Sequence, residues 1–372
     1  MLFVIPEIIQ SNGYPVESHV IQTTDGYLLT SHRIPYGKSP EAGLRRDKPV
    51  VILQHGVLSS SADWLIIGPE NALPYLLADQ GYDVWIGNSR GNTYSRKHIT
   101  LNPDTSSKFW DFSFHEMALY DLPATIDYIL KRTGRKKLSY VGHSQGTSLI
   151  FAMLSMLPSY NDLISSAHTL APAAFMSHSK SPLLSLLANF AETFGVIHGF
   201  SENTEFLPSV PFVQKTLQLL CQDGSPTQNI CLGFIFQLSG PDYAQLNTTQ
   251  IPVIVANVPS GVSTKQIIHY VQLYRTGHFR SFDYGPVKNM QKYGSKIPPD
   301  YPLERIAAPI SLHYSDNDWG IDAEDVIRLS SKIPNLIGAF RVPFAKFNHI
   351  DYLVAKDAKS LLYDDLIKLI SK

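Results

Sequence analysis

The chain has 372 residues, of which 44% are hydrophobic, and its formal net charge is -1. A chain of this length can bury a sizeable core, so we expect one large domain with an inserted subdomain, or two domains. The near-neutral charge excludes the strongly basic surfaces that bind nucleic acid or anionic membranes. The two cysteines, Cys221 and Cys231, could form one disulfide or remain two buried thiols.

Targeting signals are few in this sequence. Residues 1–6 are too short for the apolar region of a signal peptide and lack a small-residue cleavage site, which predicts a mature, truncated or non-exported chain. The longest apolar stretch, 182–200, is interrupted by residues such as Asn189 and Glu192, so we expect no transmembrane segment. A sequon at Asn247 is compatible with glycosylation of a secreted protein.

Strand and helix patterns alternate along the first half of the chain. Alternating polarity around Asp25-Gly26 predicts a β-hairpin over 16–34, and the apolar run 49–54 is typical of a buried parallel strand. The other predicted elements are helices at 71–80 and 114–131 (bent or broken at Pro123), and strands at 82–86, from Leu138 and at 167–172. This alternation predicts an α/β fold with a mostly parallel sheet.

The pattern changes after residue 176. Residues 177–305 are rich in Leu, Phe, Pro and Tyr and show helical patterns without βα alternation. Alternation returns with a strand at 309–314, a helix at 323–332, a strand at 338–343 and a last helix from about Lys356. We therefore predict a core of residues 1–176 and 306–372 with a cap inserted at 177–305. Its inner face should include apolar side chains at helical spacing, Leu183, Leu184, Leu186, Leu187, Phe190 and Phe194.

The segment 142–146 reads Gly-x-Ser-x-Gly between a strand pattern and an apolar helix pattern. This context is that of a nucleophile elbow, in which a strained turn presents a serine hydroxyl to a general base. We predict Ser144 as the nucleophile. Residues 87–91 have the same pattern, but a polar segment without a helical stripe follows them, so we expect Ser89 to be a loop residue.

The order of a serine triad on such a fold is serine, acid, histidine. Of the thirteen histidines, His349 alone follows the predicted strand 309–314, so we predict it as the base. The acid belongs to the loop 315–322. Pattern alone ranks Asp318 only slightly above Asp316, and Asp322 fits better as the N-cap of the next helix.

The loop after the strand 49–54 normally supplies an oxyanion donor. We predict the backbone N–H groups of Val57 and Gln145 as the donor pair. His55 should hold that loop, and His143 should point away from the nucleophile. The sequence has no metal-binding Cys/His spacing and no phosphate-binding glycine loop, so we predict no cofactor and no metal.

The sequence resembles the acid lipase family, the gastric and lysosomal acid lipases and their insect relatives, over nearly its whole length. The matching segments are Tyr14-Pro15, Thr24–Tyr27, Leu53–Gly56, Asp63-Trp64, Gly81–Ser95, Phe109-Trp110, Tyr120–Ala124, Gly142–Gly146 and Asn348–Asp351. The sequence departs from the family pattern at Val57, where leucine is usual, and at Gly320-Ile321, which replaces a Leu-Ala pair.

The resemblance implies an α/β-hydrolase fold with Ser144, Asp318 and His349 as the triad, and a helical cap over a lipid pocket. It also implies hydrolysis of triacylglycerols or steryl esters at a lipid–water interface, secretion or lysosomal delivery, and a disulfide between Cys221 and Cys231. Two alternatives remain: a non-catalytic lipid carrier on the same scaffold, and a soluble short-chain carboxylesterase. Loss of a triad member would favour the carrier, and a small pocket would favour the esterase.

Overall fold

The computed structural model describes residues 4–39, 47–193, 203–207 and 211–372. Its central sheet has eight strands in the order β1-β2-β4-β3-β5-β6-β9-β10. The strands are β1 (Glu17–Gln22), β2 (Leu28–Ile34), β3 (Val50–Gln54), β4 (Asp83–Ile86), β5 (Leu138–His143), β6 (Ile164–Leu170), β9 (Ile310–Tyr314) and β10 (Leu336–Arg341). From β4 to β10 all neighbours are parallel, whereas β2 is antiparallel to both β1 and β4. The predicted, mostly parallel sheet is confirmed.

The predicted hairpin consists of β1 and β2, paired from Glu17 with Arg33 to Gln22 with Leu28. Gly26 in its turn has φ +98°, and a Cβ there would lie 2.7 Å from Nε2 of His98. Only glycine fits this backbone conformation and this close approach. In contrast, β3 is buried along its whole length, as expected for a strand at the centre of a covered sheet.

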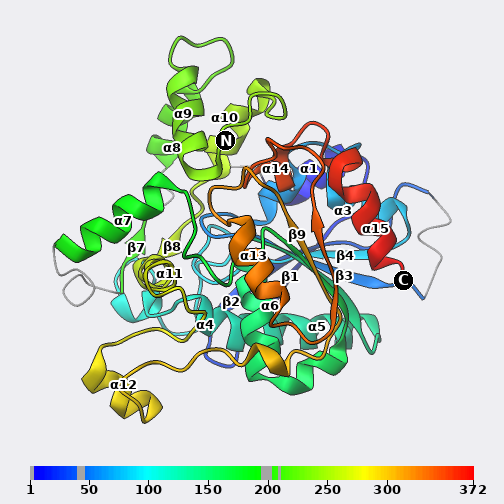
Figure 1. Ribbon diagram of the computed structural model, residues 1–372. Helices are drawn as coiled ribbons and strands as arrows, with labels where there is room; N and C mark the ends of the chain where they lie inside the picture. Colours follow the sequence, from blue (N-terminus) through cyan, green and yellow to red (C-terminus); the bar gives the residue numbers. More distant parts are fainter. Residues whose placement is uncertain (1–3, 40–46, 194–202, 208–210) are drawn as a thin grey trace.

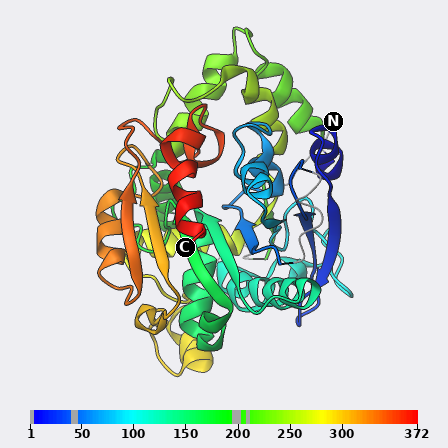
Figure 2. The same ribbon diagram turned by 90° about the vertical axis from the view of Figure 1, so that its right-hand side faces the viewer.

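Helices cover both faces of the sheet (Figure 1 and Figure 2). α3 (Leu73–Asp79) and α15 (Asp364–Ile370) lie on one face, and α5 (Leu122–Thr133), α6 (Gln145–Met156) and α13 (Ala323–Ser330) lie on the other. A short helix that was not predicted, α1 (Ile5–Ser11), buries Ile5 and Ile9 in the core. The short 3₁₀ segments are Ser61–Leu65, Ser107–Trp110, Pro158–Leu163, Thr248–Gln250 and Leu303–Arg305.

Two predicted helices are divided in the structure. The helix predicted over 114–131 consists of α4 (Phe114–Glu116), a π-helical turn at Met117–Asp121 and α5, and Pro123 lies in the first turn of α5. Proline is tolerated there because the first N–H groups of a helix have no intrahelical acceptor. The last predicted helix, from about Lys356, consists of a π-helical turn at Lys359–Tyr363 and α15, and a separate short helix that was not predicted, α14 (Asp351–Val354), precedes it.

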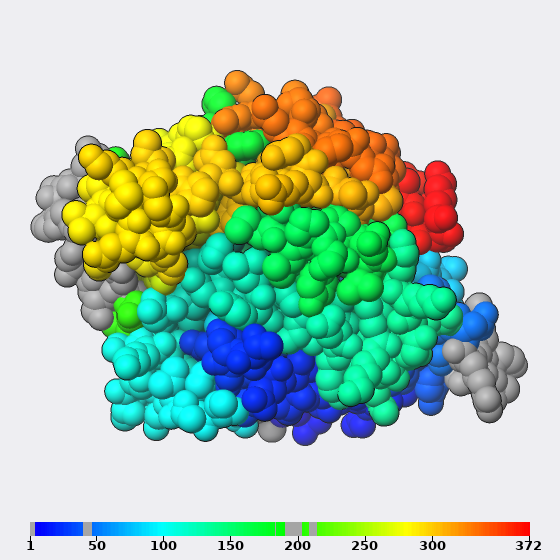
Figure 3. Space-filling model, turned by 90° about the horizontal axis from the view of Figure 1, so that it is seen from below, coloured from blue at the N-terminus to red at the C-terminus, as the bar shows by residue number. Residues whose placement is uncertain are grey.

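The inserted residues between β6 and β9 are mainly helical, with one short ribbon of β7 and β8. Their elements are α7 (Pro182–Thr193), β7 (Glu205–Phe206), α8 (Pro211–Leu220), α9 (Gln228–Ser239), α10 (Ile251–Asn257), β8 (Val262–Ser263), α11 (Thr264–Thr276) and α12 (Pro286–Tyr293). Helices α7 to α10 gather at one end of the molecule, while α12 lies at the opposite end (Figure 1). Figure 3 shows the yellow segment with α12 as a lobe at one corner of the lower face.

The insertion is therefore more than a single cap. The ring of His269 in α11 stacks on the ring of Phe114 of the core, with 4.1 Å between the centroids. The rings of Phe279 and Tyr301 also pack against Phe114. The division at residues 177 and 305 stays a prediction. Of the predicted inner-face residues, Leu184 and Leu187 pack against Ala188 and Val271, whereas Leu186 is exposed. Phe194 and the side chains of Leu183 and Phe190 lie outside the described part of the structure.

Candidate active site

The turn at 142–146 joins β5 to α6, with Ser144 between the two elements. Ser144 has φ 51° and ψ -116°, a strained conformation for a residue with a side chain. A Cβ on Gly142 would lie 2.7 Å from the carbonyl carbon of Gly146, and a Cβ on Gly146 would lie 2.5 Å from the carbonyl oxygen of Gln54. Both glycines are needed because strand, helix and β3 approach so closely.

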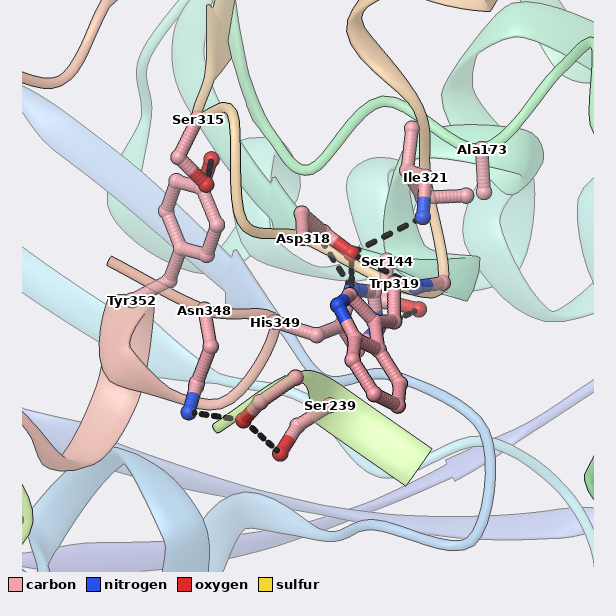
Figure 4. Close-up of polar contacts among 12 residues, drawn as sticks. Ser144, Ala173, Ser239, Ser315, Asp318, Trp319, Ile321, Asn348, His349 and Tyr352 are labelled. Atoms are coloured by element: carbon pink, nitrogen blue, oxygen red, sulfur yellow. Dashed lines mark hydrogen bonds and ion pairs between the residues drawn. The ribbon is translucent and has the colours of Figure 1, made fainter. Parts of the chain in front are cut away.

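Ser144, His349 and Asp318 form a continuous hydrogen-bonded chain (Figure 4). The Oγ of Ser144 lies 2.9 Å from Nε2 of His349, and Nδ1 of His349 lies 2.9 Å from both carboxylate oxygens of Asp318. Because the carboxylate can only accept, Nδ1 carries the proton and Nε2 is free to accept the hydroxyl proton of Ser144. The pattern is that of a nucleophile, a base and an orienting acid.

The sheet explains why residues so distant in sequence meet. Val57, Ser144, Asp318 and His349 follow β3, β5, β9 and β10, which are parallel to one another. The carboxyl ends of parallel strands lie at one edge of the sheet, where open α/β folds bind ligands. Each side chain needs only a short loop to reach the common point.

The structure separates the three aspartates of the acid loop. Asp318 is 1% exposed, and its Oδ1 also accepts the backbone N–H groups of Gly320 at 2.9 Å and Ile321 at 2.8 Å. Asp316 instead forms an exposed ion pair with Arg341. Asp322 accepts the backbone N–H of Glu324 at 2.9 Å and caps α13, as predicted. Only Asp318 reaches His349, although pattern alone had ranked it close to Asp316.

The predicted oxyanion donors lie beside the nucleophile. Gln145 follows Ser144 directly, and a Cβ on Gly56, which precedes Val57, would lie 3.1 Å from Cβ of Ser144. Among the described residues, the N–H groups of Val57 and Gln145 donate no backbone hydrogen bond. Both groups are thus available to a ligand.

Two neighbouring histidines have other partners. Nε2 of His55 accepts the backbone N–H of Ser89 at 3.0 Å, and its Nδ1 lies 2.7 Å from the carbonyl oxygen of Gly56. Nε2 of His143 lies 2.9 Å from the carbonyl oxygen of His349. Burial lowers the pKa of His55 to about 4, and burial together with the nearby His349 lowers the pKa of His143 to about 3. Both rings therefore remain neutral and support loops.

The sequence did not identify the contact between the inserted helix α9 and the loops of Asp318 and His349. The carbonyl oxygen of Ser239, the last residue of α9, accepts the backbone N–H of His349 at 3.0 Å and that of Trp319 at 3.3 Å. The motif Asn348–Asp351 had been recognised, but a backbone carbonyl has no signature in the sequence.

The cysteines form a disulfide, with 5.7 Å between the Cα atoms of Cys221 and Cys231, so the linked alternative is confirmed. It joins the end of α8 to α9. Asn247, which is half-buried, accepts the backbone N–H of the exposed Thr249 at 3.1 Å, and its glycosylation stays a prediction. Among the described residues, no His/Cys/Asp/Glu group could hold a metal ion. None of the described helices is long and apolar enough to span a membrane.

The fold and this site define an α/β hydrolase, and comparison with known proteins agrees. The family model described as alpha/beta hydrolase fold matches residues 49–356, and one described as partial alpha/beta-hydrolase lipase region matches residues 5–68. The esterase EaEST from Exiguobacterium antarcticum is similar in fold only: its TM-score is 0.54 at 12% identity, covering 96% of this chain and 100% of its own. Carboxylesterase CesB from Bacillus subtilis has a TM-score of 0.53 at 16% identity, covering 98% and 95%.

Two sequence relatives are much closer. Lipase 3 of Drosophila melanogaster is 45% identical over 362 residues, covering 97% of this chain and 91% of the relative. The gastric triacylglycerol lipase of Homo sapiens is 40% identical over 375 residues, covering 99% and 91%. The chain belongs to this family of α/β-hydrolase lipases, and the resemblance stated from the sequence is confirmed.

Proposed function

We propose that the protein is a lipase that hydrolyses carboxylic ester bonds of neutral lipids, triacylglycerols or steryl esters, through an acyl-enzyme intermediate. The observation that carries this proposal is the hydrogen-bonded chain from Ser144 through His349 to Asp318. A non-catalytic lipid carrier would have no need for such a chain at the strained turn of the sheet edge.

In this mechanism His349 Nε2 removes the proton of Ser144 as Oγ attacks the ester carbonyl carbon. The N–H groups of Val57 and Gln145 stabilise the oxyanion of the tetrahedral intermediate. His349 then gives its proton to the departing alcohol, and a water molecule repeats the sequence to release the fatty acid. The buried Asp318 carboxylate stabilises the imidazolium that forms in each half of the reaction.

The neutral lipid substrate is supported by the relatives and by the surface of the insertion. Human gastric triacylglycerol lipase is 40% identical to this chain. Large apolar side chains of the insertion are exposed, with Leu186 at 64% on α7, and Ile230 at 73% and Phe234 at 63% on α9. The two helices contact each other, and large exposed apolar side chains on adjoining helices favour a contact with an apolar partner. We infer that a lipid–water interface is the partner of these helices.

We also propose that the protein is secreted or delivered to lysosomes. The disulfide between Cys221 and Cys231 supports an oxidising compartment, because disulfides persist there and are rare in the cytosol. The sequon at Asn247 supports the same route. Peptide mapping of the protein purified from its source would detect a glycan on Asn247, and unmodified Asn247 would contradict this use of the sequon.

Hydrolysis rates on trioleoyl glycerol, cholesteryl oleate and a short-chain ester, each at pH 5 and pH 8, test the function. We expect hydrolysis of at least one long-chain substrate by the wild type and none by Ser144→Ala. Hydrolysis of the short-chain ester alone would identify a carboxylesterase. Binding of the long-chain esters without hydrolysis of any substrate would identify a lipid carrier.

A further inference from the structure

The last residue of α9 and the three residues that follow it, Ser239–Asp242, lie where the loop of the acid meets the loop of the base. The carbonyl oxygen of Ser239 accepts N–H groups from both loops, from Trp319 and from His349 itself. Asn317 Nδ2 links the same loops, because it donates to the carbonyl oxygen of Pro241 at 2.9 Å and to that of Lys346 at 2.7 Å. The end of a cap helix thus holds both catalytic loops together.

Gly240 permits this contact. Its φ of 99° and ψ of 149° belong to a region that side chains disfavour, and a Cβ there would lie 2.2 Å from the carbonyl oxygen of Asn317 and 3.0 Å from Cδ1 of Trp319. The carbonyl oxygen of Gly240 accepts a hydrogen bond from Nδ2 of Asn348 at 2.8 Å (Figure 4). The acid loop therefore packs directly on the backbone that also holds the residue before His349.

The base loop is itself closed by Asn348 and Asp351, on the two sides of His349. Oδ2 of Asp351 accepts the backbone N–H of Asn348 at 2.7 Å, and Oδ1 of Asn348 accepts the N–H groups of Ile350 at 3.0 Å and Asp351 at 3.1 Å. Both side chains are 0% exposed. These bonds restrict the backbone on each side of His349.

Asp351 meets a second buried carboxyl group, that of Asp242. Oδ1 of Asp242 accepts the N–H groups of Ala244 at 2.8 Å and Gln245 at 3.1 Å, and its carboxyl group lies close enough to Asp351 to raise the pKa of Asp351. Oδ2 of Asp242 and Oδ1 of Asp351 are both buried, and neither has a hydrogen-bond partner among the described residues. Two neighbouring carboxyl groups in one dry site disfavour the ionised form of each other.

The pKa of Asp351 is the one that this environment raises. Burial, with the nearby Asp242 and the more distant Asp318, raises the pKa of Asp351 to about 9. At neutral pH Asp351 is therefore protonated, so its Oδ1 can donate a hydrogen bond towards Asp242 while its Oδ2 accepts from the backbone N–H of Asn348. The neighbouring ionisable Tyr352 also stays neutral, because burial raises its pKa.

We propose that Asp351, paired with Asp242, and Asn348 are positioning residues that hold His349 in line with Ser144 and Asp318 and tie it to the cap helix α9. This inference rests on the proposed role of His349 as the base. A shift of about 1 Å at a catalytic group can cost about 100-fold in rate, so loosening this loop reduces turnover without touching the substrate.

The test compares Asp351→Ala and Asp351→Asn on a soluble short-chain ester, with Asp365→Ala as control, since Asp365 is exposed on α15. The fraction of molecules whose Ser144 reacts with an organophosphonate gives the concentration of active sites. We expect Asp351→Ala to lower kcat per labelled site by about 100-fold with KM unchanged. Asp351→Asn should keep most activity, because an amide can accept from Asn348 and donate to Asp242.

The pH profile distinguishes positioning from bulk stability. The wild type should lose activity as pH rises past the pKa of Asp351, about 9, because two buried charges then repel each other, whereas Asp351→Asn should keep its activity there. The proposal would be overturned if Asp351→Ala had the same kcat per labelled site as the wild type. It would also be overturned if the activities of wild type and Asp351→Asn changed identically with pH in the alkaline range.

A further readout separates this inference from the proposed function. The NMR signal of the His349 Nδ1 proton, bonded to Asp318, should shift or broaden in Asp351→Ala and stay in place in Asp351→Asn and Asp365→Ala. If the wild type hydrolysed no ester, the lipase assignment would fail while this signal still reported on the loop. An unchanged signal in Asp351→Ala would refute the positioning role by itself.

Discussion

The two Gly-x-Ser-x-Gly segments of this chain share a pattern and have opposite environments. Ser144 lies between β5 and the buried helix α6, and its hydroxyl faces His349. Ser89 follows β4 in a turn, its Oγ accepts from Nε2 of Gln54 at 2.9 Å, and its N–H is bound by His55. The pentapeptide alone therefore does not predict a nucleophile. The helix that follows Ser144 and the hydrogen bond to His349 are what support that role.

The second segment, residues 87–91, has a structural role that depends on Arg90. Arg90 is 1% exposed and binds Asp121 and Asp25 through its guanidinium group, at 2.6 to 2.9 Å. The same group lies 3.9 Å from the ring centre of Tyr27, in the turn of the β1–β2 hairpin. One segment thus presents a reactive group, and the other joins the hairpin to the core.

The largest difference should appear when each serine is removed. Ser144→Ala should lower kcat on the order of 10⁶-fold, as for other triad serines, with the fold intact. Ser89→Ala should leave activity nearly unchanged, because it deletes only the acceptor of Gln54. Mass spectrometry after organophosphonate treatment should find the label on Ser144. A label on Ser89 instead would reverse the assignment.

The next contrast concerns Asp318, the proposed acid that contacts His349. Asp318→Asn should lower kcat on the order of 10⁴-fold, because an amide can hold the wrong tautomer of His349. Asp316→Asn should stay close to wild type, since Asp316 contacts exposed Arg341. Steady-state kinetics on a soluble ester measure both. Equal activity of wild type and Asp318→Asn would remove Asp318 from the mechanism.

Breaking the buried ion cluster should affect stability and leave the chemistry unchanged. Arg90→Met leaves the carboxylates of Asp121 and Asp25 without their cation and should cost about 3–5 kcal/mol in the free energy of unfolding. The exposed pair of Arg341 and Asp316 is the control, and Arg341→Met should cost less than about 1 kcal/mol. Denaturant titrations compare the two variants. Similar costs for both would contradict the special role of Arg90.

The smallest expected effect concerns His55, which lies between the two segments. Its pKa is about 4 in the folded protein and 6.5 when unperturbed, so the unfolded chain binds more protons in this window. The contribution of neutral His55 to stability is full above pH 6.5 and is lost as pH falls towards 4, at up to about 1.4 kcal/mol per pH unit. In denaturant titrations, the free energy of unfolding of His55→Gln should fall less steeply than that of the wild type between pH 6.5 and 4. If the free energy of unfolding depended on pH equally in both proteins, His55 would already be charged in the folded wild type.

Local chemistry was enough to predict the elements and most of the site. The glycines around Ser144, the apolar run of β3 and the order of serine before histidine are properties of short segments, or of chain order, that do not depend on distant contacts. The same holds for the Asp-Gly turn of the hairpin and for Asp322 as the N-cap of α13. The interpretation of Ser89 as a loop residue also followed from what comes next in the chain.

Tertiary structure decided what depends on how loops meet. Asp316 and Asp318 are two residues apart in one loop, and only the packing of that loop against the His349 loop selects between them. The disulfide, the division of the helix predicted over 114–131 and the carbonyl of Ser239 between the catalytic loops depend on the same kind of contact. Side-chain pattern records which face of an element is buried. It does not record which distant backbone group will lie against it, because every residue has the same N–H and C=O.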